Sequence, residues 1–180
     1  MEVLEMAPST NRMTLRLPNS LLEELKKESS EKDLPLSSLA VKILNKHASF
    51  ERRFGMVSTV LLSEALFAII VENMDESTME KTTKLAPKIV KKLANLGGFE
   101  YEIDSIIKNY FTTVGKYCGW YKFKHEIDHV NHTLVFETNM GQKWAKFVSK
   151  YIRSVLESLK VHISDESIDD NVVIFKFIKR

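Results

Sequence analysis

The sequence lacks several features that would define whole classes of protein. It has one cysteine, Cys118, so no disulfide can form within one chain, and a reducing, cytoplasmic setting fits. Its most apolar run, residues 60–71, contains Ser63 and Glu64 and is too short to span a bilayer. Residues 1–9 contain two glutamates and no basic residue, unlike a secretory signal. We therefore expect a cytoplasmic protein that does not contact membranes.

Strong net charge is also missing. The chain of 180 residues has a formal net charge of only +2, with 28% charged and 44% hydrophobic residues. This is the composition of an ordinary globular protein, and no overall field marks a nucleic-acid partner. A basic binding surface would have to be local.

The N-terminal third has a distinct pattern. Residues 1–10 show no periodicity and are interpreted as a flexible arm. Residues 12–17 alternate strictly between polar and apolar side chains, which predicts a half-buried strand ended by Pro18. A helix is expected from Ser20 to about residue 32, and a second from Leu36 toward Phe54, where Gly55 ends it.

A single short strand cannot satisfy its own backbone hydrogen-bonding groups, and no second strand lies nearby in the sequence. The simplest partner is the same strand of a second copy, paired about a two-fold axis. Met13, Leu15 and Leu17 would then face the helices of the dimer. Arg12, Thr14 and Arg16 would face outward on a two-stranded ribbon, which fits the DNA major groove.

The pattern RMTLRLP, a helix, a break and then LPLSSLAVKIL resembles the ribbon-helix-helix regulators, the group of MetJ, Arc and CopG. The resemblance implies that Arg12, Thr14 and Arg16 read DNA bases. It also implies that the backbone at Leu36, Ser37 and Ser38 grips a phosphate. The sequence departs from the family at Pro35, where many members have serine or threonine.

The rest of the chain predicts an α+β protein. Residues 11–54 form the expected dimeric ribbon-helix-helix domain, residues 55–119 a helical connector, and residues 120–180 a β-β-α-β-β domain. The acidic run 165–170 is interpreted as a turn between the last two strands. The region 55–180 resembles the C-terminal part of uncharacterised archaeal ribbon-helix-helix proteins, which implies no activity.

Two further groups of residues could carry chemistry. His125, His129 and His132, with Cys118 upstream, are metal-ligand types within a short stretch, and a hairpin could gather two of the histidines. Trp144, Phe147 and Tyr151 could line a small-molecule pocket, but aromatic residues at helical spacing are more often core. We expect no bound metal and no cofactor, and no enzyme motif is present.

Together these patterns predict a homodimeric, sequence-specific transcription regulator with double-stranded DNA as its partner. An unidentified small-molecule effector is a further candidate partner for the C-terminal domain. Three alternatives remain open. One is the antitoxin of a toxin–antitoxin pair, although antitoxins usually follow the DNA-binding module with a short, poorly ordered tail. Another is a metal- or effector-sensing C-terminal domain, as in the nickel regulator NikR. An enzyme housed in the C-terminal domain is a third alternative, which would need ionisable groups clustered in a cleft.

Overall fold

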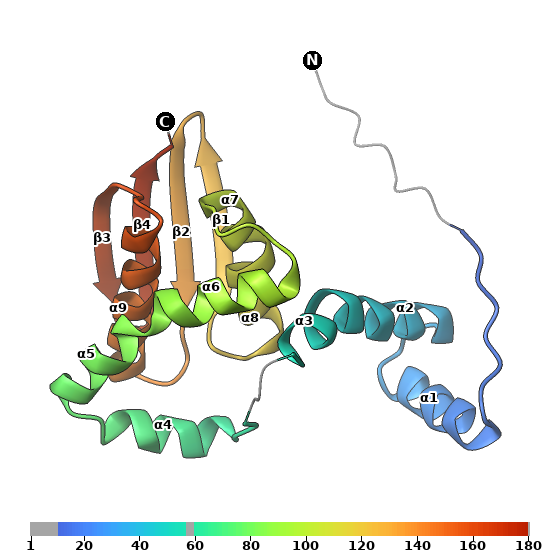
Figure 1. Ribbon diagram of the computed structural model, residues 1–180. Coiled ribbons are helices and arrows are strands. Elements are labelled where there is room, and N and C mark those ends of the chain that lie inside the picture. The colour runs from blue at the N-terminus through green and yellow to red at the C-terminus, as the bar shows by residue number, and fades with distance from the viewer. Residues whose placement is uncertain (1–10, 57–59, 180) are drawn as a thin grey trace. The chain divides into compact units, whose positions relative to one another are not determined.

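The computed structural model describes residues 11–56 and 60–179. The chain divides into two compact units, an N-terminal unit of residues 1–44 and a C-terminal unit of residues 45–180 (Figure 1). The division falls earlier than the boundary expected at residue 54. The predicted flexible arm, residues 1–10, lies outside the described residues.

In the N-terminal unit, two helices, α1 (Asn19–Glu31) and α2 (Leu36–Lys46), follow an extended segment. The turn between them is held by Ser29, whose hydroxyl donates to the carbonyl of Leu34, while the Leu34 N–H donates to the Ser29 carbonyl over 3.0 Å. Asp33 adopts a φ of 48°, a left-handed conformation that aspartate tolerates better than most residues. The break expected at Asp33-Leu34-Pro35 is therefore a hydrogen-bonded turn.

The predicted strand is absent, and this corrects the expected fold. Among the described residues 11–56, none lies in a strand, so the described N-terminal part is helical and not a ribbon-helix-helix domain. The physical reason is pairing: strand backbone groups need an adjacent strand, and the four strands of the structure pair among themselves within residues 122–178. Alternation of polar and apolar side chains gives a segment two different faces, but it does not provide the adjacent strand that its backbone needs.

The second helix continues beyond α2, as expected, but not as a regular α-helix. It passes through a π-helical turn, η1 (His47–Glu51), and ends in α3 (Arg52–Phe54), where Gly55 follows. A second π-helical turn, η2 (Ile107–Phe111), lies between α7 (Ile103–Ile106) and α8 (Thr112–Tyr117).

Three further helices occupy the expected connector: α4 (Glu64–Glu72), α5 (Glu76–Lys84) and α6 (Ala86–Gly97). Pro87 lies in the first turn of α6, which is where proline is tolerated, so it separates α5 from α6. Gly98 ends α6 with a φ of 67°, a left-handed conformation that glycine adopts at little cost.

The C-terminal third has the order β1 (Lys122–Asp128), β2 (Asn131–Glu137), α9 (Gln142–Ser158), β3 (Ile163–Asp169) and β4 (Val172–Ile178). The strands form one antiparallel sheet in the order β1-β2-β4-β3. The acidic run is not only a turn, because most of it belongs to β3. Asp165 pairs with Lys176 of β4, in register and through an ion pair of 2.9 Å. An edge strand with solvent on one side accommodates these charges.

The core of this unit lies where α9 packs on one face of the sheet, with α5 and α6 against α9 and α8 against β1 (Figure 1). Alternate residues of the central strands are buried there, among them Leu134, Phe136 and Phe175. Trp144 of α9 is fully buried, stacks on Phe147 with ring centroids 5.1 Å apart and donates its indole N–H to the carbonyl of Trp120 over 2.8 Å. The aromatic residues of α9 are therefore core, not the lining of a pocket.

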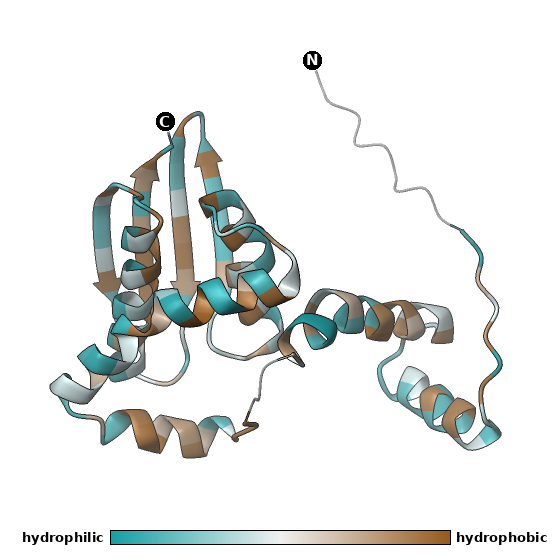
Figure 2. Cartoon of the chain, viewed as in Figure 1, coloured by the Kyte–Doolittle hydropathy of each residue, from teal (hydrophilic) through white to brown (hydrophobic). Residues whose placement is uncertain are grey.

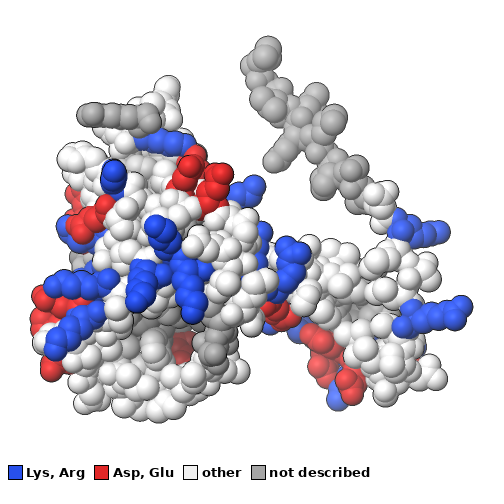
Figure 3. All heavy atoms as spheres, viewed as in Figure 1, with Lys and Arg blue, Asp and Glu red and all other residues white. Residues whose placement is uncertain are grey.

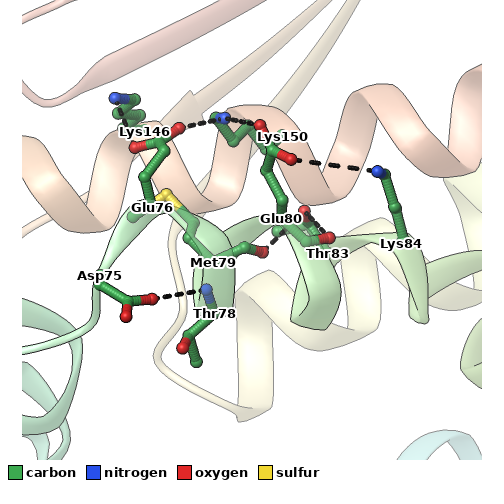
Figure 4. A network of polar contacts seen from close by, with 9 residues as sticks. All are labelled: Asp75, Glu76, Thr78, Met79, Glu80, Thr83, Lys84, Lys146 and Lys150. Carbon is green, nitrogen blue, oxygen red and sulfur yellow. Dashed lines mark hydrogen bonds and ion pairs between the residues drawn. The ribbon is translucent and has the colours of Figure 1, made fainter.

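Ion pairs join α5 to α9 at the surface (Figure 4). Glu76 lies 2.9 Å from Lys146 and 2.5 Å from Lys150, and these two ammonium groups lower the pKa of Glu76 to about 2. Below them, Met79 is almost completely buried. The charges fix the orientation of α5, while apolar contact holds it in place.

Among the described residues, no helix is both long and apolar enough to cross a membrane.

Replacing Trp144 with alanine should lower the free energy of unfolding by about 3–5 kcal/mol, the usual cost of removing a large buried aromatic side chain. Trp144→Phe retains most of the apolar contact and should cost less. Urea unfolding of both variants measures this. Equal stability of Trp144→Ala and the parent protein would contradict the packing described here.

Candidate nucleic-acid interface

The side chains expected to read DNA all reach solvent. Residues 11–20 are exposed throughout, including Arg12, Thr14 and Arg16. Their apolar neighbours are exposed as well: Met13 is 66% exposed and Leu15 54% exposed. The segment therefore offers both kinds of side chain to a partner, and no described residue covers either.

The N-terminal unit also has cationic side chains without a carboxylate partner among the described residues, two of them in this segment and one in α2. In α1 the lysines are neutralised by glutamates one turn away, as in Lys26–Glu23 and Lys32–Glu28. Arg12, Arg16 and Lys42 form no ion pair with any described residue. Although the unit has little net charge, these three cations remain available to an anionic partner.

The start of α2 has the geometry of an anion site. The first intrahelical bond runs from the Leu39 N–H to the Pro35 carbonyl over 3.0 Å. The N–H groups of Leu36, Ser37 and Ser38 therefore precede the helical hydrogen-bond ladder, at the positive end of the helix dipole. Ser37 and Ser38 are exposed and Leu36 is half-buried. Pro35 supplies no capping side chain, which leaves these donors open to a phosphate.

Two of the three candidate metal ligands are brought together. His125 Nε2 and His132 Nδ1 are 2.9 Å apart, and His132 stacks on Phe177 with ring centroids 5.0 Å apart. His129 instead contacts Asp128 in the exposed turn between β1 and β2. Among the described residues, no group of three or more histidine, cysteine, aspartate or glutamate side chains could hold a metal ion. The two rings are hydrogen-bonded to each other.

One basic surface was not anticipated from the sequence. Lys88, Lys91 and Lys92 of α6 are exposed, and basic side chains gather over this helix in Figure 3. Their spacing of three and four residues is visible in the sequence and places them on one side of a helix. Because surface lysines commonly only solvate a helix, this signal is weak.

No family model, curated protein or solved structure matches the chain.

The histidine pair should make stability depend on pH. Burial and the neighbouring His132 lower the pKa of His125 below its ordinary value, partly opposed by Asp104. The unfolded chain then binds a proton more readily than the folded one, so the free energy of unfolding should fall as the pH drops below about 6.5.

Urea unfolding at pH 7.5 and pH 5.5 measures this loss. His125→Gln, which does not titrate, should reduce the difference between the two pH values. His129→Gln, at the exposed turn, is the matched control and should leave the difference unchanged. An equal pH effect in the parent and His125→Gln proteins would refute the assignment.

Proposed function

We propose that the chain is a sequence-specific DNA-binding transcription regulator that acts as a homodimer in the cytoplasm. The observation that carries the proposal is the surface of the N-terminal unit. Exposed apolar side chains alternate along the same segment with arginines that form no ion pair with any described residue. The apolar side chains need a protein partner, and the arginines suit an anionic partner.

The case for a second copy rests on burial. In the described part of the N-terminal unit, Leu39 is the one buried apolar side chain, with 3% of its surface exposed. Several large apolar side chains of α1, α2 and the preceding segment are exposed. These are Met13, Leu15, Leu17, Leu21, Val41, Ile43 and Leu44. Figure 2 shows how apolar positions recur along these elements. So small a unit cannot bury enough surface alone, and a two-fold copy supplies a matching surface.

The case for DNA rests on placement. Arginine pairs bidentately with guanine edges in the major groove, and threonine can hydrogen-bond to a base or contact a thymine methyl. Arg12, Thr14 and Arg16 are exposed at alternate positions of one extended segment. A phosphate held at the start of α2 would fix the register of the protein on the duplex, while these side chains distinguish bases. A two-fold dimer presents the set twice, to two half-sites.

The C-terminal unit favours a regulator over an antitoxin. Antitoxins usually carry a short, poorly ordered tail after the DNA-binding module. Here residues beyond α3 contribute most of the buried core, and residues 60–179 are described almost entirely as packed helices and strands. We assign this unit the role of an effector-binding or assembly domain.

Replacing Arg16 with alanine should leave folding nearly intact but weaken specific DNA binding by about 1–3 kcal/mol for each guanine contact, of which the dimer makes two. Fluorescence anisotropy with specific and random duplexes at two salt concentrations measures this. Lys27→Ala is the control, because Lys27 is exposed but lies beside Glu31. If the specific duplex binds the Arg16→Ala protein as tightly as the parent, the segment does not read DNA.

Replacing Leu15 with lysine should dissociate the dimer. A lysine carried into an apolar contact costs several kcal/mol, which corresponds to a dimer weaker by at least about a hundredfold. Sedimentation equilibrium of the full chain measures this, with Asn11→Lys as the control for added charge. A parent protein that is monomeric at every concentration would contradict the homodimer and leave a different protein as the cover for these residues.

A further inference from the structure

A hollow of about 520 Å³ opens on the C-terminal unit beside the π-helical turn η1. One wall is the helical stretch around residues 45–53, and the other is the end of α8. The polar groups at its surface come from Asn45, Ser49, Arg52, Arg53, Lys116 and Tyr117. Its lining residues all belong to the C-terminal unit and do not include the histidine pair.

The lining of this hollow is cationic. Three of the lining side chains carry a positive charge, and none is a carboxylate. The acid on the same helical stretch, Glu51, lies 3.3 Å from Lys46 and 3.4 Å from His47, so its charge is already paired. Contact with Ser49 Oγ and the charges of Lys116 and Lys46 lower the pKa of Tyr117 below its ordinary value. The local electrostatics therefore favour an anion.

The walls are held by specific contacts. Phe50 stacks on Tyr117 with ring centroids 5.3 Å apart and on Phe54 at 4.8 Å. Lys116 lies over the Tyr117 ring, with its Nζ 5.1 Å from the centroid. These contacts tie η1 and α3 to α8, so the cationic side chains extend from a fixed framework.

Arg53 joins α3 to the π-helical turn η2. Its guanidinium donates to Asn109 Oδ1 over 2.9 Å, and Asn109 belongs to η2. The Arg53 Nε is buried and has no hydrogen-bond partner among the described residues. A buried donor without an acceptor is costly, and π-helical turns are frequent at functional sites. Both observations indicate that this part of the unit has a role in addition to packing.

We propose that this hollow binds the phosphate group of a small phosphorylated molecule. Arg52, Arg53 and Lys116 neutralise the phosphate, and guanidinium groups can hold two of its oxygens at once. The Tyr117 hydroxyl lies 3.4 Å from Ser49 Oγ, which donates to the Asn45 carbonyl over 2.6 Å, so Tyr117 supplies one further donor. A hollow of this size accommodates a phosphate together with the group that bears it. The site lies wholly within the C-terminal unit and does not depend on the proposed DNA-binding function.

Titration calorimetry of the full chain tests the proposal, with inorganic phosphate and phenyl phosphate as probes and chloride at equal ionic strength as the blank. We expect saturable binding of one phosphate per chain. Arg52→Ala and Lys116→Ala should each weaken it by about tenfold or more, as expected for a charge-assisted hydrogen bond. Lys88→Ala and Lys91→Ala, which remove exposed lysines of α6, are matched controls and should bind as the parent does.

A third arm adds duplex DNA in place of the probes and separates a free phosphate ligand from a phosphate of the DNA backbone. Saturable phosphate binding that Arg52→Ala abolishes, with DNA affinity unchanged, supports the proposal. Two results would overturn it. One is phosphate binding absent, or weakened equally by the α6 control variants. The other is loss of DNA affinity in Arg52→Ala without phosphate binding by the parent, which would make the hollow a backbone contact.

Discussion

The N-terminal unit has almost no interior, and the proposed function depends on this constraint. Among its described residues Leu39 is the one buried apolar side chain, while apolar residues such as Leu15 and Ile43 are exposed. The free energy gained from so little buried surface cannot offset the conformational entropy lost on folding. The unit therefore requires a cover. When that cover is a second copy, the arginines of the same segment appear twice, at a separation fixed by the protein.

The C-terminal unit, in contrast, has an extensive hydrophobic core. Its sheet and helices bury a continuous core around Trp144, Phe111 and Phe136. The hollow beside Arg52 and Lys116 is built on a framework of stacked aromatic rings and two π-helical turns. A phosphate bound there would be held by the rigid part of the molecule, as expected of an effector site.

Much of this architecture could be predicted from local sequence patterns. The spacing of apolar residues and the positions of glycine and proline determine where helices and strands begin and end, and both involve only a few neighbouring residues. The strand–strand–helix–strand–strand order and the break at Pro87 could be predicted in this way. The predicted ribbon was wrong because alternation around Leu15 specifies a surface but not a neighbour. The acidic run at Asp165 is part of the edge strand β3: Asp165 is exposed, whereas Glu166 is largely covered and its carboxylate is bound by Ser149 and Arg153 of α9. The exposure of Arg12, Thr14 and Arg16 agrees with their polarity, whereas the hollow at Arg52 depends on residues far apart in sequence.

The most direct test of the central claim is selection of bound sequences from a pool of random duplexes by the purified full chain. The account predicts enrichment of one motif made of two inverted half-sites, because two identical segments related by a two-fold axis read the same bases in opposite directions. Guanine should be prominent in each half-site, since arginine is its usual reader. Recovery of a pool with no enriched motif would contradict sequence-specific DNA binding, and enrichment of a single asymmetric site would contradict the homodimer.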